Sequence, residues 1–281
     1  MKTVISASRR TDLVSFFPDW LASAVKREKV LVLGPSRRPR EVDLRPETVH
    51  TFVLWSKNFE NFLADRYNLR SQLAKYDQLY FHFTITGLGG TLIEKRVPPP
   101  ATALAQLEML AELARQPELI SLRFDPIVYW KEGGEVKSNL RFFESLARQA
   151  SRLGIKKLRL SFAQWYPKAK RRAARHGFLY VDPPLETKRE AARRLVEVAR
   201  ENGLALFSCS QGWLAEVPGI TPSSCIDGRL LESLHPRREP ASSRKDKTQR
   251  QDCRCTESID IGSYIQSCPH SCIYCYANPR L

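Results

Sequence analysis

Leu119-Ile120-Ser121-Leu122-Arg123-Phe124, near the middle of the chain, is a short apolar run of the kind that forms a buried strand. Residues 138–153 follow as an amphipathic, helix-like stretch, and a second apolar run comes next, Lys157-Leu158-Arg159-Leu160-Ser161-Phe162. A strand, a helix and a further strand in succession imply a parallel sheet with helices outside it. This part of the chain therefore predicts an α/β fold.

The same alternation extends in both directions along the chain. Six runs are expected to be strands: Thr3–Ala7, Thr51–Trp55, Leu79–Ile85, Leu119–Phe124, Lys157–Phe162 and Leu204–Cys209. Helix-like segments lie between them near residues 13–28, 59–76, 102–116, 138–153 and 185–202. Six βα units are fewer than the eight of a closed barrel, so an open six-stranded barrel and a doubly wound sheet are the candidates. A small β-hairpin is expected between Val30–Leu33 and Glu41–Leu44.

The composition is that of a folded, basic protein. With 281 residues and 42% hydrophobic residues, the chain can bury a full core, which excludes global disorder. We expect a cytoplasmic protein, because no apolar run is long enough to span a membrane and the N-terminus has no apolar signal core. The formal net charge of +15 attracts anionic partners such as nucleic acid, a phosphorylated substrate or an acidic protein, and a basic enzyme with no polyanionic partner is the alternative.

The cysteines are concentrated at one end. Five of the seven lie within the last 29 residues, and Cys268, Cys272 and Cys275 form the pattern C-x3-C-x2-C. In a reducing compartment such a group argues for metal and against disulfides. Thiolates suit iron–sulfur clusters or zinc, and three ligands to a four-iron cluster would leave one iron open to a small molecule. We therefore expect residues 1–234 to form the α/β domain, 235–252 a linker, and 253–281 a cysteine-rich tail over its mouth.

Polar residues follow the expected strands, at the edge where parallel α/β proteins place their active sites. Arg9, Arg10, Lys57 and Arg123 are expected to hold a carboxylate or phosphate together. Ion pairs that only close this edge, Arg123 with Asp125 or Arg10 with Asp12, are the structural alternative. The other candidates at these strand ends are Ser56 and Asn58.

The cysteine pattern, with Tyr274-Cys275-Tyr276 around its last member, resembles the cluster loop of radical S-adenosylmethionine enzymes. That resemblance implies a partial (β/α)6 barrel, a [4Fe–4S] cluster on the three cysteines, and S-adenosylmethionine bound to the open iron and cleaved by an electron from a donor such as a flavodoxin or ferredoxin. Lys57, Arg123 and Asp125 are then the catalytic candidates, and Arg9, Arg10, Asp12, Ser56 and Asn58 the cofactor-binding ones. In most of that superfamily the cluster loop follows the first strand, whereas here it lies at the C-terminus.

Over its whole length the chain resembles the prokaryotic family called Domain of Unknown Function 1848. The stretches that carry this resemblance are Ile5–Asp12, Trp55–Asn58, Arg123–Ile127, Cys225–Asp227 and Asp260–Asn278. The family's name gives no reaction. The cluster loop alone also resembles DNA-repair proteins of the spore-photoproduct-lyase type.

Four cysteines remain, Cys209, Cys225, Cys253 and Cys255, enough for a second [4Fe–4S] cluster or a zinc site. Buried, unliganded thiols at Cys209 and Cys225 are the alternative. The sequence thus favours an iron–sulfur enzyme of radical S-adenosylmethionine type acting on an unidentified, anionic or nucleic-acid substrate. A nucleic-acid-binding or repair-related protein with a structural zinc or iron–sulfur site is the second hypothesis, and a cluster-based redox sensor the third.

Overall fold

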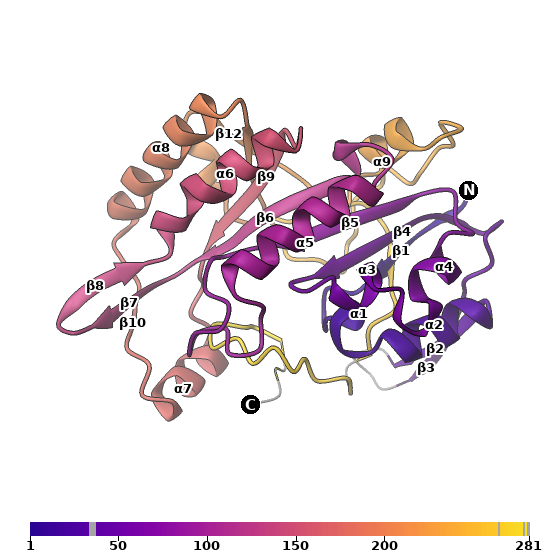
Figure 1. Cartoon of the computed structure of the whole chain (residues 1–281), viewed down its shortest axis with the longest axis horizontal. Coiled ribbons are helices and arrows are strands. Elements are labelled where there is room, and N and C mark those ends of the chain that lie inside the picture. Colours follow the sequence, from indigo (N-terminus) through magenta and orange to yellow (C-terminus); the bar gives the residue numbers. More distant parts are fainter. Residues whose placement is uncertain (34–37, 264, 278, 280–281) are drawn as a thin grey trace.

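The computed structural model describes residues 1–33, 38–263, 265–277 and 279 (Figure 1). Its central element in this part of the chain is an eight-stranded sheet in the order β12-β11-β9-β6-β5-β4-β1-β13. All neighbouring strands run parallel. The strands are β1 (Thr3–Ala7), β4 (Val49–Ser56), β5 (Leu79–Thr84), β6 (Ile120–Ile127), β9 (Lys157–Phe162), β11 (Ala205–Ser208), β12 (Ile220–Pro222) and β13 (Ile259–Asp260).

The prediction of an α/β fold with a parallel sheet is confirmed. All six expected strands are present, and β1 and β9 have the predicted bounds. The two edge strands, β12 and β13, were not expected, because three and two residues are too few to show a strand periodicity. Within the described residues β12 and β13 do not pair with each other, so the sheet is open and no closed barrel forms.

Helices connect the strands. They are α1 (Leu13–Phe16), α2 (Pro18–Lys26), α3 (Glu60–Leu63), α4 (Leu69–Leu73), α5 (Pro100–Leu113), α6 (Phe143–Arg152), α7 (Pro167–Arg175), α8 (Leu185–Glu201) and α9 (Gly228–Leu234), with 3-10 turns at Arg66–Asn68, Pro117–Leu119, Leu140–Phe142 and Gly212–Glu216. The expected helix over residues 59–76 is divided into α3 and α4. Asp65, Tyr67 and Asn68 between them have φ angles of 51°, 58° and 56°, a left-handed conformation that a helix cannot continue through.

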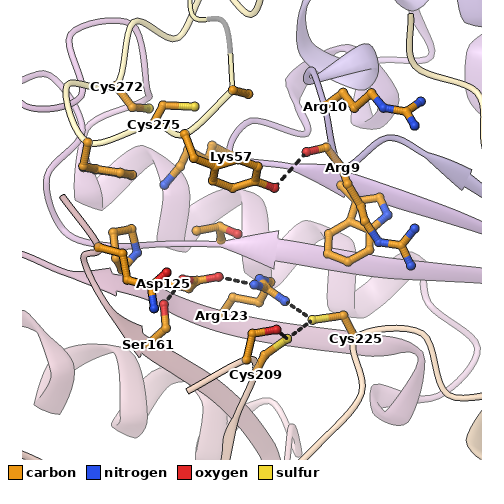
Figure 2. Close-up of a pocket in the computed structure, with 18 of the residues that line it drawn as sticks. Arg9, Arg10, Lys57, Arg123, Asp125, Ser161, Cys209, Cys225, Cys272 and Cys275 are labelled. Atoms are coloured by element: carbon orange, nitrogen blue, oxygen red, sulfur yellow. Dashed lines mark hydrogen bonds and ion pairs between the residues drawn. The ribbon is translucent and has the colours of Figure 1, made fainter. Parts of the chain in front are cut away.

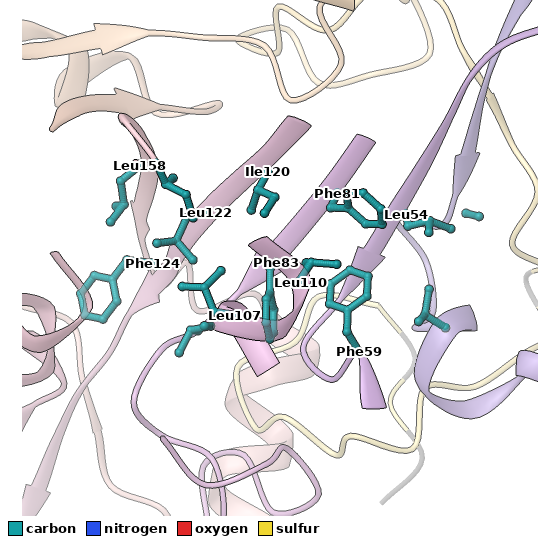
Figure 3. Close-up of a cluster of buried hydrophobic side chains, with 14 of the residues drawn as sticks. Leu54, Phe59, Phe81, Phe83, Leu107, Leu110, Ile120, Leu122, Phe124 and Leu158 are labelled. Carbon is teal, nitrogen blue, oxygen red and sulfur yellow. The ribbon is translucent and has the colours of Figure 1, made fainter. Parts of the chain in front are cut away.

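The main hydrophobic core lies between one face of the sheet and the helices. Phe81, Phe83, Leu122 and Leu158 alternate along the strands with polar residues and pack against Leu107 of α5 and its neighbours (Figure 3). Side chains of α2, α4, α6 and α8 belong to the same cluster of buried residues. This packing fixes the strands and leaves their carboxyl ends free for a site.

The C-terminal part of the chain covers the opposite face of the sheet. Val4, Val53 and Tyr80 point to this face and pack against Ile226 and Leu231, which belong to the segment after β12. Further along, β13 pairs with β1, so that Ile5 lies opposite Ile259. The tail is therefore part of the sheet before it reaches the cysteine motif.

Two smaller sheets complete the described structure. β2 (Lys29–Leu33) and β3 (Pro39–Asp43) form the predicted antiparallel hairpin, whose expected turn residues 34–37 lie outside the described residues. β7 (Tyr129–Glu132) pairs with β8 (Glu135–Ser138) and with β10 (Tyr180–Val181). Neither of these last pairings was expected.

Residues 235–252, the expected linker, have no regular secondary structure, but His235, Ala241 and Asp246 within them are buried. Of the helices in the described residues, none is both long and apolar enough to cross a membrane.

Candidate active-site cavity

The carboxyl ends of six strands, β1, β4, β5, β6, β9 and β11, open into one cavity of about 300 Å³. The tail closes its other side, and all seven cysteines line it. Figure 2 shows Cys272 and Cys275 on one side, Cys209 and Cys225 on the other, and Arg123 and Asp125 between them. Residues more than 250 positions apart therefore meet at the edge where the sequence placed the site.

We call residues 268–275 the three-cysteine loop. It is held by its backbone: Ile273 N–H donates to the Ile93 carbonyl at 3.0 Å, and the Ile273 side chain is buried in a small apolar cluster with Ala169 and Ala173 of α7. Arg172, on the same helix, donates from Nη1 to the carbonyl oxygens of Ile273 and Cys275, each at 2.8 Å. The loop is thus fixed to the protein without using its sulfurs.

Asp12 connects the loop to the first strand end. Its carboxylate accepts hydrogen bonds from Ser15 N–H, Ser56 Oγ, Lys57 N–H and His270 Nε2, the last at 2.7 Å. A carboxylate has about four acceptor positions, so these four donors saturate it. His270 is 2% exposed and lies edge-on to Phe16, so it is neither a solvent-facing residue nor free to bind a metal through Nε2.

Lys57 is paired with a carboxylate that the sequence did not point to. Its Nζ lies 2.8 Å from Oε1 of Glu94, which is fully buried and also accepts from Thr86 Oγ1 and from the Tyr274 hydroxyl of the loop. Burial lowers the pKa of Lys57, but the Glu94 carboxylate outweighs this and raises that pKa above its ordinary value. Lys57 therefore carries its charge next to Cys272.

The three sulfurs of the loop do not all lie within 4.8 Å of one another. Among the described residues, the only group of three or more potential ligand atoms that all lie within 4.8 Å of one another does not include a cysteine. Burial raises the pKa of Cys268 to about 12 and raises the pKa values of Cys272 and Cys275. A single zinc ion holds its thiolates about 3.8 Å apart, given Zn–S bonds of about 2.3 Å in a tetrahedron. A four-iron cluster does not require so close a set, because its thiolates bind different irons.

Arg9 and Arg123 lie over Trp55, with their guanidinium carbons 5.5 and 5.4 Å from its ring centre. Arg123 pairs with Asp125, which also accepts a hydrogen bond from Ser161. The Arg123–Asp125 ion pair expected as the structural alternative is therefore present, although both residues also line the cavity.

The remaining predicted site residues divide between the cavity and its surroundings. Arg10 and Ser56 line the cavity, and Arg10 Nη1 donates to the Gly262 carbonyl at 2.8 Å and pairs with Asp260 at 3.3 Å. The partner of Arg10 that the structure shows is Asp260, which the pairing of β13 with β1 brings to it. Asn58 is not among the lining residues, and its side-chain oxygen accepts from Gln106 Nε2.

Cys209, Cys225, Cys253 and Cys255 form a second group, which we call the four-cysteine ring. The sulfurs of Cys209 and Cys225 are 3.2 Å apart, Cys253 contacts Cys209 and Cys255, and Cys255 contacts Cys225. Contact with Cys209 and the nearby Arg123 guanidinium lower the pKa of Cys225. Arg123 Nη1 lies 3.0 Å from the Cys225 sulfur, and Arg9 contacts Cys255.

Asp77, His235 and Glu239 are the group whose ligand atoms do lie within 4.8 Å of one another. They sit near the amino ends of the strands, away from the cavity. Lys2 and Arg237 pair with both carboxylates, at distances of 2.5 to 3.3 Å, so the negative charge is already balanced. We therefore interpret this group as an ion-pair network.

Sequence reasoning missed Glu94, Arg172 and Asp260. Glu94 lies in an irregular segment with no recognisable pattern. Arg172 lies in a basic run that is typical of a solvent-exposed helix face, although in the structure its side chain is buried, with 8% exposed. Only Asp260 carried a signal, because it stands in the tail just before the cysteine motif.

The fold and the site define a parallel α/β protein with a cysteine-lined cavity at the carboxyl ends of its strands. The chain belongs to the family described as "Domain of unknown function (DUF1848)", whose sequence model matches residues 4–277. This confirms the family resemblance seen in the sequence. No curated protein matches the chain.

Two solved structures show a weak similarity to this chain. A D-hydantoinase from a Bacillus sp. AR9 is 16% identical with a TM-score of 0.32, over 61% of this chain and 36% of that one. A second D-hydantoinase is 14% identical with a TM-score of 0.35, over 77% and 45%. The chain spans less than half the length of either structure, and similarity this low carries no argument about activity.

Proposed function

We propose that this protein is an iron–sulfur enzyme of radical S-adenosylmethionine type, with a [4Fe–4S] cluster on Cys268, Cys272 and Cys275. The observation that supports this most is that these three thiols line the same cavity as the carboxyl ends of the six central strands. Such a cluster supplies an electron and an iron without a protein ligand, where S-adenosylmethionine binds.

The strand order supports the same proposal. From β1 through β4, β5, β6, β9 to β11, neighbours in the sheet follow the order of the chain without a reversal. A doubly wound sheet reverses its order at a switch point, whereas a barrel does not. We therefore interpret the sheet as a partial (β/α)6 barrel, opened along the edges formed by β12 and β13.

The chain's own residues have distinct tasks in this proposal. Asp12 orients His270 and the three-cysteine loop. Because the acceptor positions of Asp12 are already filled, Asp125 is the carboxylate that would bind ribose hydroxyls. Arg9, Arg10 and Arg123 give the cavity the positive potential that the carboxylate of the cofactor or an anionic substrate requires. Lys57 balances the charge of thiolates beside it.

The surroundings of the cavity favour an anionic partner. Lys170, Arg171 and Arg175 are exposed on α7, the helix that holds the three-cysteine loop through Arg172. This basic face suits an acidic electron donor of the flavodoxin or ferredoxin kind, and with the net charge of +15 it also suits a nucleic-acid substrate. We place this chemistry in the cytoplasm, where thiols stay reduced.

The test is anaerobic purification, followed by assays of iron, sulfide and 5′-deoxyadenosine formed from S-adenosylmethionine under reductant. We expect about four irons and four sulfides on this loop and measurable cleavage. Cys272→Ala should lose both, while Arg194→Ala, at an exposed position on α8 that does not line the cavity, should lose neither. A colourless protein that contains only zinc, and stays so after reconstitution with iron and sulfide, would end the proposal.

A further inference from the structure

The four-cysteine ring joins three separate parts of the chain. Cys209 follows β11, Cys225 lies between β12 and α9, and Cys253 and Cys255 belong to the tail before β13. Backbone contacts hold the last two parts side by side: Thr256 N–H donates to the Ile226 carbonyl at 2.9 Å, and Ile226 N–H points to the Cys255 sulfur at 3.5 Å. The thiols are therefore brought together by the fold.

The four sulfurs of the ring gather in one small buried cluster. Each sulfur interacts with two others, and the sulfurs of Cys209 and Cys225 are 3.2 Å apart. Four thiolates on one tetrahedral ion stand about 3.8 Å apart, whereas the thiolates of a four-iron cluster bind different irons and stand further apart. No three sulfurs among the described cysteines lie mutually within 4.8 Å, so the ring is flattened, with its opposite corners further apart than its sides. For all four sulfurs to bind one zinc ion, the opposite sulfurs must move closer together by about 1 Å or more.

The charges around the ring agree with a bound tetrathiolate centre. Zn²⁺ with four thiolates has a net charge of two minus, and burying such a group requires nearby positive charge. Arg123 Nη1 lies 3.0 Å from the Cys225 sulfur, and the Arg9 guanidinium interacts electrostatically with Cys255, so two guanidinium groups lie beside the ring. Cys225, Cys253 and Cys255 are 6%, 5% and 2% exposed, which leaves little water to solvate the thiolates.

We propose that Cys209, Cys225, Cys253 and Cys255 bind a single zinc ion, separate from the iron–sulfur cluster of the proposed function. The ion would tie the start of the tail to the end of β11 and to the segment before α9. Because the site uses none of the three loop cysteines, it does not depend on the proposed function. Structural zinc sites with four thiolates contribute directly to folding.

The test is metal analysis of the full chain, purified without chelators and then dialysed. We expect one zinc per chain in wild type and in Cys272→Ala, and loss of that zinc in Cys225→Ser with the iron retained. Cobalt titration of the zinc-depleted wild type should give the visible bands of a tetrahedral cobalt–thiolate centre at one equivalent. This measurement does not depend on whether Cys225→Ser folds.

Two results would overturn the zinc site. One is about eight irons per chain in wild type, with Cys225→Ser losing half of them together with sulfide, since this would make the ring a second iron–sulfur site. The other is wild type that takes up neither zinc nor cobalt. A protein that binds one zinc but never cleaves S-adenosylmethionine would support the ring while removing the proposed function, so the two failures are distinguishable.

Discussion

The three-cysteine loop and the four-cysteine ring line the same cavity but are built differently. The loop takes its sulfurs from eight consecutive residues and is fixed by Arg172, by the contact of Tyr274 with Glu94 and by the contact of His270 with Asp12. The ring takes its sulfurs from three distant segments and places the sulfurs of Cys209 and Cys225 3.2 Å apart, with Arg123 Nη1 3.0 Å from the Cys225 sulfur. The difference indicates that contacts along one short segment shape the loop, whereas the packing of distant segments brings the ring together.

The largest effect on stability is expected at Glu94, which contacts Lys57 and Tyr274 of the three-cysteine loop. Glu94→Ala leaves Lys57 buried without its partner, and an uncompensated buried charge costs about 3–5 kcal/mol of the free energy of unfolding. Urea unfolding of the metal-free chain would measure it. Glu132→Ala removes an exposed pair with Lys137 and should change the free energy of unfolding far less, because solvent screens that pair. Equal losses for the two variants would show that the loop is not held by this buried pair.

The second prediction tests whether the iron site and the zinc site are separate, through a change at Arg172 beside the three-cysteine loop. Arg172→Ala removes the donor to the carbonyls of Ile273 and Cys275, which should loosen the iron site by about 10- to 100-fold and leave zinc unchanged. Release of iron to a chelator measures this, with Arg171→Ala on the exposed face of the same helix as the control. If Arg172→Ala lost zinc instead, the two sites would not be separate.

The third prediction tests whether Arg123 supports zinc binding by the four-cysteine ring. Arg123→Ala removes the guanidinium 3.0 Å from the Cys225 sulfur, so zinc affinity should fall by about 10-fold while iron content stays the same. Arg123→Lys keeps the charge but not the forked geometry, so its zinc affinity should lie between those of wild type and Arg123→Ala. Competition with a chromogenic zinc chelator gives the affinities. Unchanged zinc affinity in Arg123→Ala would mean that the guanidinium does not support the ring.

The smallest effect on stability is expected near the amino ends of the strands, where Asp77, His235 and Glu239 bind no metal in our interpretation. Burial lowers the pKa values of His50 and His235. Below about pH 6.5 the unfolded chain binds protons that the folded chain does not, so the free energy of unfolding should fall with decreasing pH. The slope should stay below about 1.4 kcal/mol per pH unit for each histidine. His235→Gln should flatten this dependence. A free energy of unfolding that rises toward low pH would contradict the assignment.

Much of the fold could be predicted from local patterns. The bounds of β1 and β9 follow from runs of apolar residues that a buried strand requires, and the polar residues after these runs line the cavity. The division of α3 from α4 could not be predicted, because Tyr67 and Asn68 adopt left-handed angles without a glycine to announce them. The edge strands β12 and β13 are set by neighbouring strands and not by their own residues.

The sequence by itself determined the parallel α/β class and the three-cysteine loop, because a strand run and a C-x3-C-x2-C motif each lie within a few neighbouring residues. Only the tertiary structure decided that Asp260 meets Arg10, that Glu94 balances Lys57, and that Cys209 and Cys225 touch. These contacts join residues that are 16 to 250 positions apart, and no local pattern records which distant partner a buried charge or thiol will find. That choice depends on how the whole chain packs, with the tail added as a strand beside β1.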